Sequence, residues 1–271
     1  MSSLRNTTRI LPLLLAALIG LASPAAGDVT RPEPEAPLLA TTYAGDEYLK
    51  YDISWMGLIK AGELVMEIKP LDAAKERFLV KVTAKSAGLL AFFYPVRDYF
   101  EIVVQGRERL PVRMTMEQNE GSRQGRRITV YNQKGGEVTY SKDGRPPEIF
   151  PVTGPVHNEF TSFLIMRALP LRAGESVTVP TFADRKRHEV KVLVEQGAAS
   201  ESVLGQVETM KVEPQLNFAG LYQKVGNPEI WLTADQNRIP IRIEAKIKIG
   251  SLTAELSEYR RQGAPLPNGS G

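Results

Sequence analysis

Cysteine is absent from this chain of 271 residues, which also holds only two histidines and two tryptophans. The absence excludes disulfide bonds, thiol nucleophiles and thiolate ligands for a metal. The folded state must therefore be stabilised by packed apolar side chains, and the chain is long enough to bury a full core.

Motifs of catalysis are equally scarce. The sequence has no Gly-x-Ser-x-Gly nucleophile motif and no glycine-rich phosphate loop. His157 and Glu159 form a His-x-Glu pattern that zinc deaminases use, but those enzymes also need cysteine ligands. His188 is the other imidazole, and a metal site shared by both histidines and a carboxylate is the alternative to capping or surface roles. We expect no metal, no cofactor and no enzymatic activity.

Long apolar runs are missing except at the N-terminus. Arg5 and Arg9 precede an apolar core at residues 10–22, and small residues lead to a cleavage point before Asp28. This order is typical of a secretory signal peptide, which we place at residues 1–27. A signal anchor is the alternative, although the run is short for crossing a bilayer. No cysteine follows it, which excludes a lipid-anchored lipoprotein. We therefore expect an exported protein that is not integral to a membrane after cleavage.

A strong excess of one charge is also missing. The chain has 34 basic and 31 acidic residues, and without Arg5 and Arg9 the count becomes 32 against 31. This balance does not favour nucleic acid as a partner. Basic clusters occur at residues 107–113, 123–127 and 184–188. We interpret them as solvated turns, the alternative being a shared surface for lipid phosphates or an acidic envelope polymer.

What the sequence does contain is apolar alternation with a period of two, which predicts antiparallel strands with one buried face. We expect a single β-rich domain at residues 48–260, preceded by an extended proline-rich linker at 28–47 and followed by a disordered tail at 261–271. The predicted strands lie at residues 49–55, 62–69, 78–84, 97–105, 110–118, 126–132, 136–141, 175–181, 190–194, 206–213, 229–234 and 239–249.

The strand at residues 239–249 is the clearest example. Ile239, Ile241, Ile243, Ala245, Ile247 and Ile249 alternate with ions and one proline. A two-residue turn at Gly250 and Ser251 would place Ile249 opposite Leu252 and Lys246 opposite Glu255. This register keeps apolar residues facing apolar residues.

One segment follows helical spacing instead. Residues 157–169 place Phe160, Phe163 and Leu164 on one face, with Asn158 as a cap. We predict a short helix here that lies on the sheet as a lid or plug. The expected fold is therefore all-β with one short helix, as a large curved antiparallel sheet or incomplete β-barrel.

Three stretches together resemble a known family. They are "YDISWMGLIKAGELVMEI" (51–68), "NEFTSFLIMRALPLRAGE" (158–175) and "IWLTADQNRIPIRIEAKIKIGSLTAEL" (230–256). They are similar to the bacterial family called domain of unknown function 3108, over about residues 46–259. Glu159, Ser162 and Arg167 are the nearest matches to that family's helix. The resemblance implies a β-rich envelope protein exported to the periplasm of a Gram-negative bacterium, with no catalytic residues to transfer.

Two aromatic-rich stretches interrupt the alternation, at residues 86–100 and 215–233. They either fill the core or form apolar loops that contact a lipid-like ligand or a membrane surface. We predict a non-enzymatic protein that binds an apolar or amphipathic envelope molecule. The alternatives are a scaffold for another envelope protein and, with less support, a cell-wall hydrolase. The candidate ligand-binding residues are Phe92, Phe93, Tyr94, Tyr99, Phe160, Phe163, Phe218, Tyr222 and Trp231.

Overall fold

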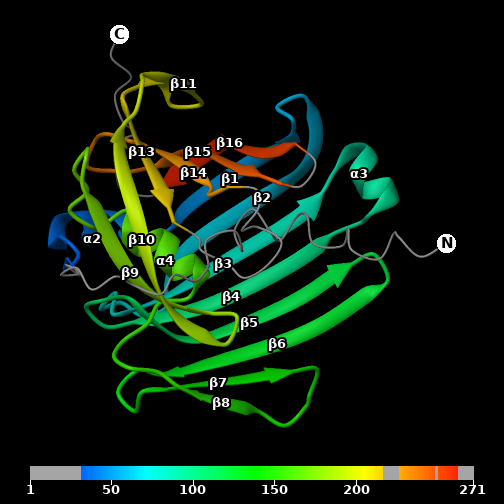
Figure 1. Cartoon of the computed structure of the whole chain (residues 1–271), viewed down its shortest axis with the longest axis vertical. Coiled ribbons are helices and arrows are strands. Elements are labelled where there is room, and N and C mark those ends of the chain that lie inside the picture. The colour runs from blue at the N-terminus through cyan, green and yellow to red at the C-terminus, as the bar shows by residue number, and fades with distance from the viewer. Residues whose placement is uncertain (1–31, 216–225, 248–249, 262–271) are drawn as a thin grey trace.

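One antiparallel sheet of 14 strands dominates the computed structural model (Figure 1). The structure describes residues 32–215, 226–247 and 250–261. The sheet order is β8-β7-β6-β5-β4-β3-β2-β1-β16-β15-β14-β13-β10-β9, in which β1 with β16 and β13 with β10 are the neighbours that are not consecutive in sequence. The strands are β1 (Glu47–Trp55), β2 (Ile59–Pro70), β3 (Arg77–Ser86), β4 (Arg97–Gln105), β5 (Leu110–Glu120), β6 (Arg123–Asn132), β7 (Glu137–Lys142), β8 (Glu148–Pro151), β9 (Ser176–Ala183), β10 (Lys186–Gln196), β13 (Thr209–Pro214), β14 (Glu229–Thr233), β15 (Pro240–Lys246) and β16 (Ser251–Arg261). A small separate hairpin pairs β11 (Ser200–Ser202) with β12 (Gly205–Val207).

The sheet curls around its apolar face. Its strands carry register shifts, including two beside β1 near the middle of the sheet, where Ser257 of β16 and Ala61 of β2 are the extra residues. Such bulges bend a strand and increase its twist, which turns a broad sheet into an incomplete barrel. The predicted all-β fold class is confirmed.

The two edge strands are joined by the segment between β8 and α4. In this segment His157 forms a parallel bridge with Thr181 of β9, and the Phe182 N–H donates to the His157 carbonyl at 2.7 Å. On the other side Gln133 binds the backbone of Val156, with hydrogen bonds of 2.9 and 3.0 Å. The segment therefore covers part of the β9 edge of the sheet, which would otherwise be open to further pairing.

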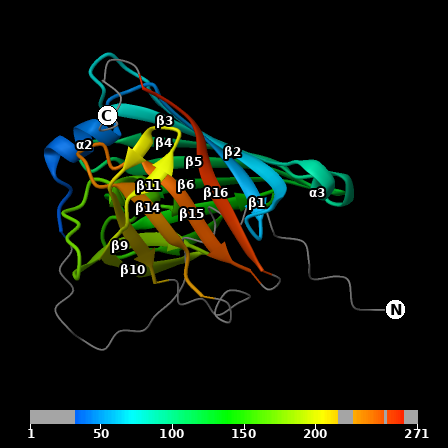
Figure 2. The same cartoon turned by 90° about the horizontal axis from the view of Figure 1, so that it is seen from above.

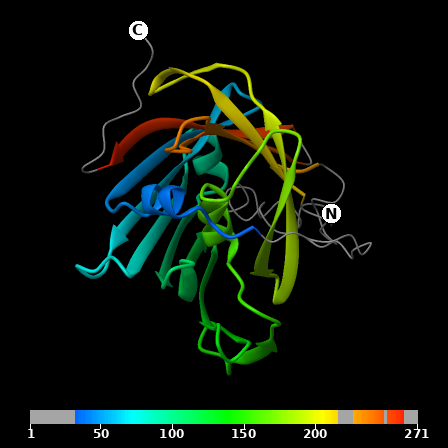
Figure 3. The same cartoon turned by 90° about the vertical axis from the view of Figure 1, so that its left-hand side faces the viewer.

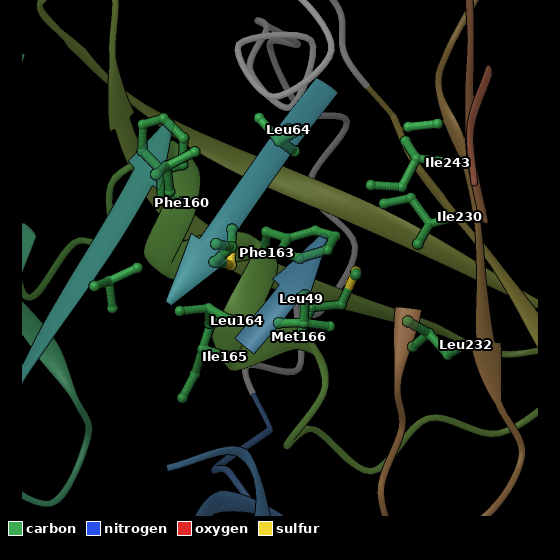
Figure 4. Packing of buried hydrophobic residues seen from close by; sticks show 14 of the residues in the cluster. Leu49, Leu64, Phe160, Phe163, Leu164, Ile165, Met166, Ile230, Leu232 and Ile243 are labelled. Carbon is green, nitrogen blue, oxygen red and sulfur yellow. The ribbon is translucent and has the colours of Figure 1, made fainter. Parts of the chain in front are cut away.

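Helix α4 (Glu159–Met166) occupies the interior between the two halves of the sheet (Figure 3). Residues 160–166 are all buried, and Figure 4 shows Phe163, Leu164 and Met166 beside Leu49 of β1. The predicted cap is confirmed, because the Asn158 side chain accepts from the Thr161 N–H at 2.8 Å. The helix is shorter than predicted and acts as a plug, with each large buried side chain contributing roughly 1.5–3 kcal/mol.

The interpretation of residues 28–47 as an extended linker needs correction. Residues 36–42 form helix α2 (Ala36–Thr42), with Pro37 in its first turn, where a missing N–H costs nothing. Leu38 and Thr42 are buried, and the Tyr43 ring packs against Phe78 at 5.2 Å. Apolar contacts hold this segment on the domain, and β1 already begins at Glu47. Residues 28–31 lie outside the described residues.

The alternation in β15 is confirmed, but the predicted hairpin register is wrong. Ile239, Ile241, Ile243 and Ala245 are buried, whereas Ile249 lies outside the described residues. Ala245 rather than Ile249 faces Leu252, and Arg242 rather than Lys246 faces Glu255. The connection is longer than two residues, because the Ile247 N–H donates to the Gly250 carbonyl. The shift is by four residues, and an even shift leaves every side chain on its predicted face.

Candidate functional site

One end of the sheet gathers exposed apolar side chains from two hairpins. Helix α3 (Gly88–Phe93) projects there between β3 and β4, at the opposite side from α2 (Figure 2). Phe92 and Phe93 are 80% and 72% exposed, and Leu58 in the β1–β2 turn is 88% exposed. Met56 in the same turn and Ile59 at the start of β2 are also exposed. We call Met56, Leu58, Ile59, Phe92 and Phe93 the apolar rim.

Hydrogen bonds fix the two parts of the apolar rim beside each other. The Ala87 N–H, just before α3, donates to the Ala61 carbonyl of β2 at 3.0 Å. The Met56 N–H donates to the Ser251 carbonyl at 2.9 Å, which brings the β15–β16 turn to the same end. Exposed large apolar side chains scattered singly are ordinary, but a cluster on one rim is typical of an interaction surface.

A hollow of about 610 Å³ lies next to α3 on the outer face of the sheet. Its volume falls within the usual range for small-molecule sites, roughly 300–1,000 Å³. We call it the α3 groove. It is lined by Lys85, Ser86, Ala91, Pro95, Val96, Arg97, Tyr99, Asn119 and Gly121.

Local sequence explains why α3 forms at this place. Gly88 has a φ of +58°, and a Cβ there would lie 3.0 Å from the Lys60 carbonyl oxygen. Only glycine combines that backbone conformation with so close an approach. Pro95 follows the end of the helix, and the Gly121 N–H donates to its carbonyl at 2.7 Å. Ser86 closes the base by accepting from the Val96 N–H at 2.8 Å. Hydrogen bonds therefore hold together the segments that line the groove.

Two cations face each other in the groove. Lys85 of β3 lies directly opposite Arg97 of β4, and neither forms an ion pair with any residue that the structure describes. Four residues along the same strand pair, Lys81 faces Glu101 at 3.3 Å. On its other side Lys85 lies opposite Glu63 of β2, whose carboxylate pairs instead with Lys60 at 3.0 Å and Lys50 at 3.7 Å. Like charges directly opposite each other destabilise a sheet. An anion bound between Lys85 and Arg97 would remove that repulsion.

Beneath the groove, on the inner face, lie two buried carboxyl groups. Asp98 and Glu120 are 0% and 3% exposed, and the Tyr94 hydroxyl donates to Glu120 Oε2 at 3.2 Å. The Asn119 N–H donates to Asp98 Oδ1 at 2.8 Å. Burial raises the pKa of Asp98 to about 6, and the nearby charge of Glu120 acts in the same direction. This pair connects the base of α3, through Tyr94, to β4 and β5.

Replacing Asp98 by Asn is expected to stabilise the protein at neutral pH by about 1–3 kcal/mol. The folded-state pKa of about 6 lies above the unfolded value of about 3.9, so the folded state binds more protons in between. Wild-type stability should therefore fall as the pH rises through this window, whereas Asn keeps the acceptor for Asn119 without a charge. Urea unfolding at about pH 4 and about pH 7 measures the difference. Equal pH dependence of both proteins would contradict a raised pKa.

Seven of the nine predicted ligand-binding residues lie in the described part of the chain, and these seven do not line one interior cavity. Tyr99 lines the α3 groove, Phe92 and Phe93 stand on the adjoining helix, and Tyr94 ends that helix. Phe92, Phe93 and Tyr99 therefore lie outside the barrel, whereas Tyr94 packs against the core and its hydroxyl reaches Glu120.

The remaining predicted residues lie elsewhere. Phe160 and Phe163 belong to the packed core, where Phe160 stacks on Phe100 at 4.7 Å. Trp231 points away from its buried neighbours in β14 and packs against the Arg242 guanidinium at 5.3 Å. Phe218 and Tyr222 lie outside the described residues.

The histidines are buried parts of the fold. Burial lowers the pKa of His157 to about 3, so the ring is neutral at physiological pH. The His188 Nε2 donates to the Ala183 carbonyl at 3.0 Å. Burial raises the pKa of Glu159 to about 7 in the first turn of α4. Within residues 32–215, 226–247 and 250–261, no group of three metal-binding side chains comes together.

Arg167 pairs with Glu47, which is 120 positions away in the sequence, and not with the nearby Glu159. Its guanidinium binds the Glu47 carboxylate through both terminal nitrogens, at 2.8 and 2.9 Å. Both side chains are almost completely buried, and the Tyr259 hydroxyl donates to Glu47 at 3.1 Å. The pair connects the end of α4 to the start of β1.

The sequence analysis did not identify the residues that surround the α3 groove and the apolar rim, namely Lys85, Arg97, Leu58 and the Asp98–Glu120 pair. The stretch at residues 86–100 marked the region, because its aromatic residues broke the alternation. The cations carried no local signal, since their opposition depends on the pairing of β3 with β4.

In the described part of the chain, no helix has the length and apolar character needed to cross a bilayer. No curated protein matches the sequence. A crystal structure of a β-barrel-like protein of domain of unknown function DUF1849, from Brucella abortus, is similar with a TM-score of 0.52. The two share 10% identity over 79% of this chain and 97% of that chain, which supports the barrel-like fold. The hypothetical protein CT021 from Chlamydia trachomatis also matches, with a TM-score of 0.42 and 10% identity over 88% of this chain and all of that one.

The sequence itself gives the family. The family model described as "Protein of unknown function (DUF3108)" matches residues 50–257, which include every strand of the large sheet at least in part. The chain belongs to the DUF3108 family.

Proposed function

We propose that this protein is a non-enzymatic envelope protein, exported to the periplasm, which binds an anionic amphipathic molecule at the α3 groove. One observation carries the proposal: Lys85 and Arg97 face each other, neither in an ion pair within the described residues, beside a helix that exposes Phe92 and Phe93. A phosphate or carboxylate fits between the cations, and an acyl chain fits against the aromatic rings.

The packing of the interior supports an external site. Because α4 is buried among the strands, an acyl chain that entered the core would have to displace Phe163 and its neighbours. Such a displacement would cost several kcal/mol for each large side chain removed from the core. The α3 groove needs no such rearrangement. A second hollow of about 640 Å³, lined by residues that include Leu39, Ile165 and Val179, lies at the end of the sheet near α2.

The alternatives predicted from the sequence lead to different expectations. A scaffold that pairs the β9 edge of the sheet with another protein is disfavoured, because His157 already pairs with Thr181 there. A cell-wall hydrolase would use converging carboxylates, and Asp98 and Glu120 are the nearest such pair, but both are buried below the groove.

The test is binding of a fluorescent fatty acid, kept below its critical micelle concentration, to the wild type and to the double variant Lys85→Glu/Arg97→Glu. We expect the dissociation constant to rise at least about tenfold, because two charge contacts become repulsive. The matched control is Lys134→Glu/Lys186→Glu, which changes the net charge equally at exposed sites away from the groove. Its affinity should stay within about twofold of the wild type.

Native mass spectrometry of protein gently extracted from producing cells gives an independent result. A co-purifying lipid, lost in the Lys85→Glu/Arg97→Glu variant, is the expected outcome. Protein without bound lipid, together with no saturable probe binding, would overturn the proposal.

A further inference from the structure

The apolar rim reaches beyond the α3 groove, and the proposed ligand site does not account for its full extent. Met56 and Leu58 in the β1–β2 turn and Ile59 at the start of β2 do not line the groove. Phe92 and Phe93 pack edge to face at 5.2 Å and remain largely exposed. Two hairpins therefore present bulky apolar side chains to solvent at the same end of the sheet.

Unpaired positive charge surrounds these side chains. Lys85 and Arg97 flank α3, Arg123 begins β6 after the adjoining turn, and Lys246 ends β15 near the β1–β2 turn. Within the described ranges none of the four forms an ion pair, and only Lys85 and Arg123 lie opposite an acid in the strand pairing, Glu63 and Glu120 respectively. The acids of the β1–β2 hairpin are engaged, since Asp52 and Glu63 both bind Lys60, at 3.2 and 3.0 Å.

Exposed apolar side chains flanked by cations match the chemistry of an anionic membrane surface. The interface of an anionic bilayer offers a hydrocarbon region for Leu58 and the phenylalanines, and phosphates for the lysines and arginines. A second copy of this chain would bring the same positive charge to the same rim, which disfavours self-association.

We infer that the apolar rim docks on the surface of an anionic bilayer, with Leu58, Phe92 and Phe93 inserted among the lipids. This inference rests on the proposed function, because docking would place the α3 groove at the level of the lipid headgroups. It adds that the protein takes its ligand from a membrane rather than from solution.

The absence of native cysteine allows a local test in the full chain. Single variants Leu58→Cys, Phe92→Cys and, as control, Glu108→Cys in the β4–β5 turn at the other end receive an environment-sensitive fluorophore. With vesicles of phosphatidylglycerol and phosphatidylcholine we expect a blue shift at positions 58 and 92 and none at 108. Raising the salt concentration, or using phosphatidylcholine alone, should weaken the shift at least about fivefold.

A second variant set separates this inference from the proposed function. Met56→Ser/Leu58→Ser/Ile59→Ser should reduce the vesicle-dependent shift of the label at position 92 about tenfold or more, since buried apolar area determines insertion. It should leave binding of the monomeric fatty acid within about twofold of the wild type. Normal binding of the fatty acid without any shift at 58 or 92 would overturn the docking and leave the proposed function standing. Docking without fatty-acid binding would instead overturn the proposed function.

Oligomerisation offers a further check. If light scattering showed a dimer and the labels at 58 and 92 shifted on dimerisation without vesicles, the rim would be a protein interface and the inference would be overturned. Shifts of equal size at 58, 92 and 108 would also overturn it, because the rim would then not be the part that inserts.

Discussion

Replacing Arg167 by Met is expected to lower the free energy of unfolding by about 3–5 kcal/mol. The guanidinium forms two short hydrogen bonds to Glu47 and donates to the Arg238 carbonyl at 2.9 Å and the Asn237 carbonyl at 3.2 Å. Methionine fills the space but leaves a buried carboxylate without its counter-ion. Most of the loss comes from that uncompensated charge rather than from the net strength of the pair.

The double variant Glu47→Leu/Arg167→Met separates these contributions. With both charges removed, we expect most of the lost stability to return, because the desolvation cost disappears together with the attraction. Chemical denaturation of both single variants and of the double variant gives the coupling energy. A single variant Arg167→Met that loses less than about 1 kcal/mol would indicate that water reaches Glu47.

Truncating Phe163 to Ala should destabilise the protein by about 3–5 kcal/mol. The side chain is almost completely buried where α4 meets the sheet, beside Leu49 and Leu64 (Figure 4). The strands around α4 are joined by a continuous ladder of hydrogen bonds, so they cannot collapse fully into the space left behind. Unfolding in urea measures the loss.

The matched control is Phe93→Ala, which removes the same atoms from an exposed position. We expect its stability to stay within about 0.5 kcal/mol of the wild type. A small apolar molecule such as benzene should raise the stability of Phe163→Ala and leave that of the wild type unchanged, because only the variant has an empty apolar cavity. Equal losses in both phenylalanine variants would contradict the plugged interior.

Much of this architecture follows from local patterns. The inward faces of β1, β3 and β15 follow from alternating letters, since successive side chains of a strand point to opposite faces. Asn158 marked the start of α4 because its short polar side chain satisfies a free N–H at a helix end. The prediction of an extended linker at residues 28–47 failed, because its prolines gave no clear helical pattern. Helix α2 buries Leu38 against a surface that distant strands form.

The candidate site depended on contacts that no local pattern encodes. Lys85 and Arg97 become opposed only when β3 pairs with β4, and the aromatic stretch between them could equally have filled the core.

By itself the sequence determined a cysteine-free, antiparallel β protein with one capped helix, because strand and helix periods depend on neighbours within a few residues. Tertiary structure alone decided that this helix fills the barrel, that Arg167 reaches Glu47 and that aromatic side chains stand outside beside unpaired cations. These outcomes depend on strand register and sheet curvature. Both are determined by contacts between residues more than a hundred positions apart in the sequence.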